Sequence, residues 1–573
     1  MNQNNTFLPT TLKEMQVLGW ERPDVVFFSG DAYIDHPAFG TAVIARLLES
    51  IGLQVAVVPQ PNWQDDLRDF KKFGAPRLFF AVNSGAMDSM VNRYTANKRI
   101  RSDDAYTPDG RAGARPDRAL TVYSKILKSL YPNIPVVIGG IEASLRRFTH
   151  YDFWDDTLKP SILIDSQADY LIYGQGEKPV KMLTDCLREN RRSEICNIPQ
   201  TAFALPRNEA NRFVENSIQL HSFEDCKKNS DRFGNNFKII ETESNSLRAK
   251  RLTEDCGQMT VVVNPPCPPL TTAELDSIYA LPFTRRPHPR YGNKHIPAYE
   301  MIRHSINIHR GCFGGCSFCT ISAHQGKFIS SRSVASVLEE LERLTAMPDF
   351  RGHISDLGGP AANMYRMSGK NAALCGVCRK PSCLFPAICR NLNLDHAPLL
   401  ELYAAVRRHP AVKKVTIGSG IRYDMFIDKN GFIDQTGKKY FETVMKYHVS
   451  GRLKVAPEHT ASKVLDAVRK PSFELFVRLK SAFDSLNRGQ KSPKQLIPYF
   501  ISALPNCTDA DMQQLAAIMK RMSYKLEQVQ CFTPTPMTLA STIFYTGKDP
   551  YTGKKMYVAK SPDKRKQQQN YFF

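Results

Sequence analysis

The sequence lacks any hydrophobic run long enough to cross a membrane. A membrane-spanning helix needs about 18–20 consecutive apolar residues, whereas the longest apolar stretches, residues 133–141 and 260–266, have the length of a strand. The first residues, MNQNNTFLPTTLKEM, also lack the apolar segment of a secretory signal. We therefore expect a cytoplasmic protein that makes no membrane contact.

Acidic residues are scarce relative to basic ones. The chain of 573 residues holds 77 Lys and Arg against 56 Asp and Glu, which gives a net charge of +21. Such an excess suits an anionic partner, and nucleic acid is the usual one. The alternative is a basic surface that is simply solvated, and the diffuse distribution of the charge favours it slightly. The densest basic stretch is 548–573, which we expect to be a partly disordered basic C-terminal tail.

Most of the chain alternates strand-like apolar runs with helical patterns. Over about residues 20–190 this alternation predicts an α/β domain with a doubly wound parallel sheet. From residue 298 onward, six further strand–helix units suit a partial (β/α)6 barrel of the TIM type. The polar region between them, rich in Pro and Arg near its end, indicates an extended connector. The expected organisation is a Rossmann-like N-terminal domain (1–195), a connector or insert (196–297), a core domain (298–547) and the tail (548–573).

Half of the 14 cysteines lie between Cys312 and Cys389. Clustered cysteines in a reducing cytoplasm are metal ligands or catalysts more often than disulfides. Within HRGCFGGCSFCTISAHQGKF (309–328), Cys312, Cys316 and Cys319 follow the spacing C-x3-C-x2-C, and no fourth thiol is nearby. Structural zinc uses four ligands, whereas three thiolates suit a 4Fe–4S cluster with one iron left open. The alternative is a zinc knuckle or a cysteine-rich turn without metal.

The aromatic Phe318 completes a pattern, C-x3-C-x-Φ-C, that resembles the signature of radical S-adenosylmethionine (SAM) enzymes. The resemblance implies that SAM binds the open iron through its amino and carboxylate groups and that Phe318 packs near the adenine. It also implies reductive cleavage of SAM to methionine and a 5′-deoxyadenosyl radical, with electrons from a flavodoxin- or ferredoxin-like donor. Neither the substrate nor a general acid or base can be identified from the sequence.

Other expected strand ends supply further candidates for SAM binding by the same resemblance. Gly358 and Gly359, in DLGGPAANMY, stand where such enzymes often have G-G-E, whose turn binds the SAM amino group. Pro360 replaces the Glu, so a carboxylate partner is in doubt, although backbone carbonyls remain.

Two later strand ends add polar candidates near the expected positions of the SAM ribose and carboxylate. Ser419 and Arg422 lie in IGSGIRYD, and Glu458 lies in VAPEHT. Each residue taken alone also fits an ordinary turn or a hydrogen-bonded polar group.

Several longer motifs, spread over nearly the whole chain, look like the YgiQ-type family of radical SAM proteins. The resemblance implies a radical SAM enzyme but stops short of a substrate. Two alternatives remain open: a radical SAM enzyme that modifies RNA, and a non-catalytic metal-binding nucleic-acid adaptor with zinc at both cysteine clusters. The motifs are GDAYIDHPAFG, GGIEASLRRF, RGCFGGCSFCTISAHQG, VAPEHT, IPYFISALP and FTPTPMTLASTIFYTGKDP.

A second group of thiols lies in CGVCRKPSCLFPAIC (375–389). Cys375, Cys378, Cys383 and Cys389 match the ligand count of a structural zinc ion or a second iron–sulfur cluster. The alternative is free thiols, with Cys383 or Cys389 buried as a small apolar residue.

The N-terminal domain resembles the cobalamin-binding type of Rossmann-like module that precedes some radical SAM cores. Cobalamin ligation by histidine would need D-x-H-x-x-G, but here Asp35 directly precedes His36 and the glycine, Gly40, comes one residue late. We therefore expect no cobalamin, and we expect His36 to be a loop or helix-start residue. A module that keeps the fold but recruits substrate is the preferred interpretation.

Overall fold

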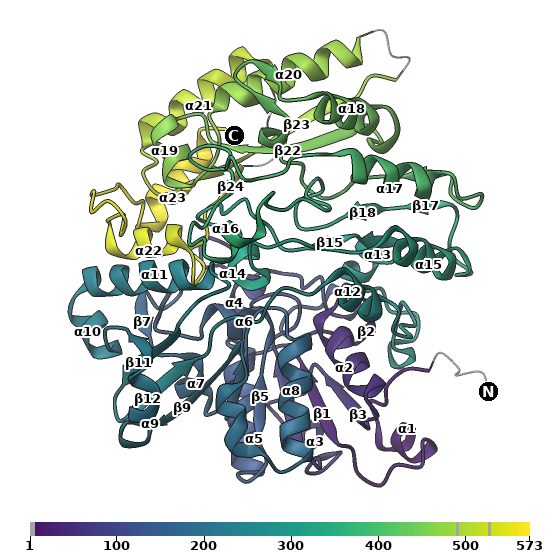
Figure 1. The fold of residues 1–573 in the computed structure, drawn as a ribbon, viewed down its shortest axis with the longest axis vertical. Coiled ribbons are helices and arrows are strands. Elements are labelled where there is room, and N and C mark those ends of the chain that lie inside the picture. The colour runs from purple at the N-terminus through teal and green to yellow at the C-terminus, as the bar shows by residue number, and fades with distance from the viewer. Residues whose placement is uncertain (1–5, 489–491, 525, 527–528, 573) are drawn as a thin grey trace. The chain divides into compact units, whose positions relative to one another are not determined.

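The computed structural model describes residues 6–488, 492–524, 526 and 529–572, and the chain forms two compact units (Figure 1). Unit 1 comprises Met1–Pro268, Leu281–Arg303 and Thr535–Met537. Unit 2 comprises Pro269–Ala280, His304–Pro534 and Thr538–Phe573. Residues 1–5 of the expected N-terminal domain and residue 573 of the expected tail lie outside the described residues.

Unit 1 is built on a nine-stranded sheet in the described part of the chain, and five of its strands are parallel neighbours in the order β3-β1-β4-β5-β8. Runs of Val, Phe and Ile form these strands, and almost all of their residues are buried. Strands of a parallel sheet are buried on both faces, which explains the continuous apolar runs. The predicted α/β fold with a parallel sheet is confirmed. The strands are β1 (Val25–Ser29), β3 (Val55–Pro59), β4 (Phe79–Asn83), β5 (Val136–Ile138) and β8 (Tyr170–Ile172).

Helices cover both faces of this sheet. Val26 and Phe28 of β1 pack with α5 (Ala119–Leu130) in one apolar cluster. Val25 and Phe27 of the same strand pack in a second cluster with α2 (Gly40–Ser50) and α8 (Glu177–Arg188). Alternate residues of a strand point to opposite faces, so the two clusters mark the two sides of a doubly wound sheet.

The stretch expected to be an extended connector (196–297) differs from that expectation, because much of it continues the sheet. A strand pairs antiparallel with β8, and three more strands follow it at the same edge. The polar sequence hid these strands because Thr253 and Glu254 of β11 are themselves buried. The added strands are β9 (Thr201–Pro206), β10 (Ser217–Gln219), β11 (Arg251–Cys256) and β12 (Met259–Val263).

Unit 2 carries short parallel strands in chain order with helices between them, as predicted. Among its described residues, β14 pairs with β18, β17 with β19, and β22 with β23, which in turn pairs with β24. One apolar cluster joins Ile306, Leu357 and Val415 of successive strands to Leu341 of α15 (Val334–Thr345) and Leu402 of α17 (Ala397–Arg407). The strands are β14 (Ser305–Asn307), β17 (His353–Ile354), β18 (Asp356–Gly358), β19 (Lys414–Val415), β22 (Arg452–Glu458), β23 (Gln495–Ser502) and β24 (Val529–Cys531).

Part of the expected disordered tail (548–573) is folded onto unit 2. It ends in α23 (Pro562–Asn570), which buries Gln568. The amide of Gln568 accepts from the backbone N–H of Ala503 at 2.9 Å and donates to the carbonyl of Cys507 at 3.0 Å. Within the described ranges, no helix has both the length and the apolar character needed to cross a membrane.

Candidate functional site

The three-cysteine loop follows β14 at its carboxyl end. Its base is closed by β15 (His309–Arg310), which pairs antiparallel with β16 (Ser330–Ser331). Inside the loop, the N–H of Cys312 donates to the carbonyl of Gly326, and the N–H of Cys319 donates to the carbonyl of Cys316, both at 3.1 Å. The loop is therefore anchored at both ends and folded back on itself, which holds the three cysteines in one turn.

The two glycines of this loop are required by close approaches from other segments. A Cβ atom on Gly314 would lie 2.8 Å from Nη1 of Arg422. A Cβ atom on Gly315, whose φ is +61°, would lie 2.3 Å from the carbonyl oxygen of Pro381. The first glycine admits a guanidinium group to the loop, and the second admits the backbone of the second cysteine segment.

The Gly358–Gly359 turn lies beside the cysteine loop, because β18 is the parallel neighbour of β14 and pairs Gly358 with Asn307. A Cβ atom on Gly358 would lie 2.8 Å from Oγ of Ser419, and one on Gly359 would lie 2.5 Å from Cε1 of His309. His309 is 1% exposed, and this burial lowers its pKa to about 3, so its ring is neutral. The structure thus brings the predicted Gly358, Gly359 and Ser419 together at adjacent strand ends.

Sequence reasoning missed Asp356, which organises this turn. One carboxylate oxygen accepts from the backbone N–H of Gly418 at 2.8 Å and of Ser419 at 3.3 Å, and the other accepts from the Ser419 hydroxyl at 2.5 Å. The hydroxyl of Ser419 is therefore already engaged. The available signal was an acidic residue two positions before Gly358, inside a motif already singled out.

Arg422 is turned toward the cysteine loop. Its Nη1 donates to Sγ of Cys316 at 3.0 Å, while Nε and Nη2 contact the carboxylate of Asp424 at 2.9 Å and 2.5 Å. Burial by itself lowers the pKa of Arg422, but the carboxylate of Asp424 beside it raises that pKa well above its ordinary value. Arg422 therefore carries a fixed positive charge beside a predicted cluster ligand.

Glu458 adds a negative group to the same region. It lies at the end of β22 with φ of +68°, a left-handed conformation that is uncommon outside glycine. Burial raises the pKa of Glu458, which the ion pair with Lys470 at 3.4 Å opposes. Burial likewise raises the pKa of Cys319 to about 12, with further increases from Cys316, Cys312 and Glu458. Glu458 is therefore a buried acid paired with Lys470 at the carboxyl end of β22.

The remaining predicted residue of the loop, Phe318, is half-buried between the second and third cysteines. Within the described ranges, no three His, Cys, Asp or Glu side chains converge on a single metal ion. A 4Fe–4S cubane binds each cysteine through a different iron, so its ligands do not meet at one point. Three thiols on a glycine-rich turn beside a buried cation therefore fit such a cluster in their donor chemistry. Cys312, Cys316 and Cys319 as its ligands stay a prediction.

The second cysteine segment is tied to the three-cysteine loop. The hydroxyl of Ser382 donates to the carbonyl of Gly314 at 2.8 Å, and the N–H of Cys383 donates to the carbonyl of Phe313 at 3.0 Å. The ammonium group of Lys327, from the far end of the loop, donates to the carbonyl of Cys378 at 3.0 Å. The sequence did not indicate these contacts. They place any metal bound at residues 375–389 next to the three-cysteine loop.

The four thiols of that segment differ in exposure. Cys375, Cys378 and Cys383 are partly buried, and Cys389 is exposed. Burial raises the pKa of Cys383 to about 11. The amide of Asn391 donates to Sγ of Cys375 at 3.2 Å. A zinc ion or a second iron–sulfur cluster at these residues stays a prediction.

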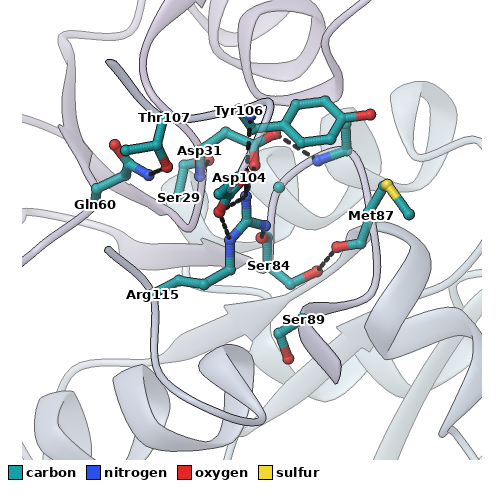
Figure 2. Close-up of polar contacts among 12 residues, drawn as sticks. Ser29, Asp31, Gln60, Ser84, Met87, Ser89, Asp104, Tyr106, Thr107 and Arg115 are labelled. Atoms are coloured by element: carbon teal, nitrogen blue, oxygen red, sulfur yellow. Dashed lines mark hydrogen bonds and ion pairs between the residues drawn. The ribbon is translucent and has the colours of Figure 1, made fainter. Parts of the chain in front are cut away.

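Unit 1 has a buried charge network at the carboxyl ends of β1 and β4, where sheets of this kind bind ligands (Figure 2). Arg115 is buried; it donates to the carbonyl of Ser84 at 2.8 Å and forms ion pairs with Asp31 at 2.8 Å and Asp104 at 3.1 Å. Burial raises the pKa of Asp31 to about 6. Sequence reasoning did not predict this network, because Arg115 and its partner Asp31 lie far apart in the chain and meet only in the fold.

Comparison with known families and proteins adds evidence that the geometry of the site does not supply. The family described as Radical SAM N-terminal matches residues 7–305. A UPF0313 protein of Bacteroides thetaiotaomicron is 53% identical to this chain, over 99% of this chain and 94% of its own length. A UPF0313 protein of Porphyromonas gingivalis is 52% identical, over 99% of this chain and 90% of its own length. A UPF0313 protein of Methanocella arvoryzae is 46% identical over 97% of this chain and 91% of its own.

Solved structures of two radical SAM enzymes also align with the chain. The methyltransferase TsrM from Kitasatospora setae, with cobalamin and a [4Fe-4S] cluster bound, has a TM-score of 0.47 and 14% identity over 90% of this chain and 74% of its own. The cobalamin-dependent enzyme OxsB has a TM-score of 0.47 and 9% identity over 92% of this chain and 55% of its own.

The expectation of no cobalamin conflicts with these aligned structures, both of which hold cobalamin, TsrM together with a [4Fe-4S] cluster. The D-x-H-x-x-G pattern reports only a histidine ligand to cobalt, so its loss around His36 does not exclude the cofactor. The prediction that His36 is a loop residue agrees with the structure, where it follows β2 (Ile34–Asp35) and precedes α2. Its Nδ1 accepts from the N–H of Ala38 at 3.1 Å.

Proposed function

This chain belongs to the UPF0313 family of radical SAM enzymes, and from that premise we propose that Cys312, Cys316 and Cys319 hold a 4Fe–4S cluster that binds SAM. When bound and reduced, such a cluster would supply the electron that cleaves SAM to methionine and a 5′-deoxyadenosyl radical, which would take hydrogen from a substrate that the site does not identify. The electron comes from a flavodoxin- or ferredoxin-like donor, and the enzyme works in the cytoplasm.

The observation that carries this proposal is the meeting of the cysteine loop and the Gly358–Gly359 turn. Both lie at the carboxyl ends of the adjacent parallel strands β14 and β18. Catalytic groups of β/α barrels gather at that end of the strands. The packing of Arg422 against Gly314 and of His309 against Gly359 leaves no room for side chains at either glycine, so both turns lie close against their neighbours.

The other site residues have distinct roles in this proposal. Gly359 offers its backbone carbonyl to the amino group of SAM, since Pro360 supplies no carboxylate, and Gly358, whose carbonyl accepts from the N–H of Ile308 at 2.9 Å, positions the turn. Ser419, held by Asp356, and Glu458, held by Lys470, fix the polar rim near the ribose and carboxylate. Phe318 provides an aromatic face for the adenine.

The finer architecture is part of the same proposal. With β17 and β18 counted as one segment, because a single residue separates them, the parallel strands among the described residues of unit 2 form six segments in chain order. The parallel pairs are β14–β18, β17–β19, β22–β23 and β23–β24. This pattern supports a partial (β/α)6 barrel over about residues 298–547. Unit 1, with its strand order β3-β1-β4-β5-β8, corresponds to a Rossmann-like module that recruits substrate.

The test is anaerobic. The full chain is reconstituted with iron and sulfide and given SAM and dithionite, and 5′-deoxyadenosine is measured. We expect Cys316→Ala to abolish formation of 5′-deoxyadenosine. The control is Cys267→Ala, which removes a partly buried cysteine of unit 1 and should preserve the product. A wild-type chain that loads a cluster yet never cleaves SAM, even with candidate substrates, would oppose the proposal. A chain that takes up zinc but no iron would support the non-catalytic adaptor instead.

A second candidate function, modification of RNA, is favoured by a basic surface attached to the cysteine loop. The helix α22 (Leu539–Thr546) begins at this loop, where the N–H of Ala540 donates to the carbonyl of Ser317 at 2.9 Å. The chain that follows exposes Lys554, Lys555 and Tyr557. Cations that track phosphates and aromatic faces that stack on bases are typical of RNA-binding surfaces.

RNA binding by the full chain tests this candidate. Changing Lys554 and Lys555 together to Glu should weaken binding of a transfer RNA pool at least tenfold and reduce the slope of log K against log salt by about 1–2. The matched control changes Lys438 and Lys439, exposed on α18 (Gln435–Thr443) of the same unit, to Glu. Equal losses in both variants would assign the effect to net charge, and no binding at low salt would oppose an RNA substrate.

A further inference from the structure

Each of the three guanidinium nitrogens of Arg422 already has a partner within unit 2. Nη1 donates to Sγ of Cys316 at 3.0 Å, and Nε and Nη2 contact the two carboxylate oxygens of Asp424 at 2.9 Å and 2.5 Å. The side chain is 11% exposed. The sequence suggested a role at the SAM carboxylate, but the geometry instead links Arg422 to a cysteine of the loop.

This contact is held from two sides. Asn363, which is buried, accepts from the backbone N–H of Arg422 and donates to its carbonyl, both at 2.9 Å. On the other side, a Cβ atom on Gly314 would lie 2.8 Å from Nη1. The backbone of Arg422 is therefore clamped, and the absence of a side chain at Gly314 is what lets its guanidinium reach the sulfur.

A cation fixed beside a ligand sulfur acts on the electron affinity of the cluster. Hydrogen bonds to the sulfurs and nearby charge are main determinants of the reduction potential of iron–sulfur clusters. Reduction adds one negative charge, so the positive charge of Arg422 favours the reduced state and raises the potential. Asp424 opposes Arg422, because its carboxylate cancels part of that positive charge.

We propose that Arg422 and Asp424 are positioning residues that set the reduction potential of the cluster with opposite signs, Arg422 raising it and Asp424 lowering it. Arg422 acts through the Cys316 sulfur and makes no direct contact with SAM. This inference rests on the proposed 4Fe–4S cluster. Its consequence is that the ease of electron delivery is controlled from the third strand end of unit 2.

The test compares reduction potentials of reconstituted full-length variants by an optical titration under anaerobic conditions, without SAM or turnover. Arg422→Gln should lower the potential and Asp424→Asn should raise it, each by at least tenfold in the reduction equilibrium, which is about 59 mV for one electron. Arg422→Lys, which keeps the charge, should shift the potential less than Arg422→Gln. A merely structural role would move both charge-removing variants in the same direction or not at all.

A matched control separates the effect of a charge near the cluster from the general effect of removing a buried arginine. Arg565 is also buried in unit 2, where it lies on α23 and donates to the carbonyl of Phe532. Arg565→Gln should leave the potential unchanged in whatever fraction loads a cluster. If Arg422→Gln fails to hold iron, the difference in reduction potential between Asp424→Asn and wild type still shows whether the carboxylate lowers the potential. A loaded wild type whose variants keep its potential overturns this inference alone, whereas a wild type that never holds iron overturns the proposed function as well.

Discussion

Gly359 is the residue where a single added methyl group has a clear steric consequence. Its Cβ atom would lie 2.5 Å from Cε1 of His309, whose ring is buried and has little room to move. We expect Gly359→Ala to lower the free energy of unfolding by about 1–3 kcal/mol, as overpacking does. We also expect it to weaken SAM binding to the reconstituted protein at least tenfold, as measured by equilibrium dialysis.

Gly420 is the matched control for that change. It lies in the neighbouring strand-end motif, and a Cβ atom there would meet nothing within 4 Å. Gly420→Ala should leave stability and SAM binding close to wild type, because it adds no contact. Similar losses in both variants would mean that the Gly359 effect comes from backbone stiffness rather than from contact with His309.

The buried Glu254 of unit 1 leads us to predict how the stability of the fold changes with pH. Burial raises the pKa of Glu254 from 4.5 to about 7. Between those pH values the folded chain holds a proton that the unfolded chain releases, so stability falls as pH rises through this window. At about 1.4 kcal/mol per pKa unit, the loss is on the order of 3 kcal/mol.

Urea unfolding of wild type and Glu254→Gln at pH 5 and pH 8 checks this prediction. Gln resembles the protonated acid, and its carbonyl can still accept from the backbone N–H of Thr149, which Glu254 contacts at 2.7 Å. The variant should therefore lose less stability than wild type between the two pH values. An identical pH dependence in both proteins would show that Glu254 is ionised in the folded state.

The sequence proposed single residues where a short motif carries the chemistry. The three cysteines of the loop and the Gly358–Gly359 pair are of this kind; the structure places them at adjacent strand ends, and their roles as ligands stay predictions. Asp356 and Asp424 were not recognised, because their importance depends on contacts that folding creates, such as that of Asp356 with Ser419 across 63 positions of the chain. Both lie within or at the end of motifs that were singled out, and so do their partners Ser419 and Arg422, but the pairing of the side chains appears only in the fold.

At the scale of elements, the two cysteine segments are joined through Gly315. A Cβ atom at Gly315 would lie 2.3 Å from the carbonyl oxygen of Pro381, whereas a Cβ atom at Gly326 meets nothing within 4 Å. Both glycines have positive φ, +61° and +81°, so alanine at either position costs about 1–2 kcal/mol. Only Gly315→Ala additionally displaces residues 375–389 from the loop.

We therefore expect Gly315→Ala to lose iron from the reconstituted protein and Gly326→Ala to keep most of it. Iron and sulfide per chain are the measurement, and hydrogen exchange of residues 375–392 reports whether the segment has detached. The contact between segments would be irrelevant to the cluster if both variants retained or lost iron equally.

Elements whose apolar pattern matches their burial were predicted well, and the others were not. The strands β1, β3 and β4 are continuous apolar runs buried on both faces. The strand β11 was missed because it buries Thr253 and Glu254, and α23 was missed because only Arg565 and Gln568 of a polar sequence are buried. Burial of polar groups depends on hydrogen-bond partners elsewhere in the chain, and sequence periodicity does not show them.

At the scale of the whole molecule, the chain alternates between its two units rather than completing one before the other. It crosses after residues 268, 280, 303, 534 and 537. The expected boundaries near 196 and 298 assumed that each unit is one continuous stretch. The interleaving was not predictable, because two neighbouring short segments, 269–280 and 281–303, join different units through contacts with residues far away in sequence.

The crossing after residue 280 predicts that Tyr279 and Leu281, two positions apart, stabilise different units. Tyr279, at the end of α12 (Thr272–Tyr279), belongs to unit 2: its buried ring packs against the guanidinium group of Arg332, 4.1 Å from its centre. Leu281, two residues later, packs into the apolar cluster of unit 1 that contains Val25 and Phe27. Truncating a buried aromatic costs about 3–5 kcal/mol, and truncating a partly buried leucine costs less.

Hydrogen exchange of full-length variants tests this division of the chain. Tyr279→Ala should speed exchange in residues 330–345, which include β16 and α15 of unit 2, and leave β1 of unit 1 unchanged. Leu281→Ala should do the reverse, because its side chain supports the other core. If both variants loosened the same peptides, the boundary after residue 280 would be contradicted, and α12 would act as a connector rather than as part of the unit that holds the cysteine loop.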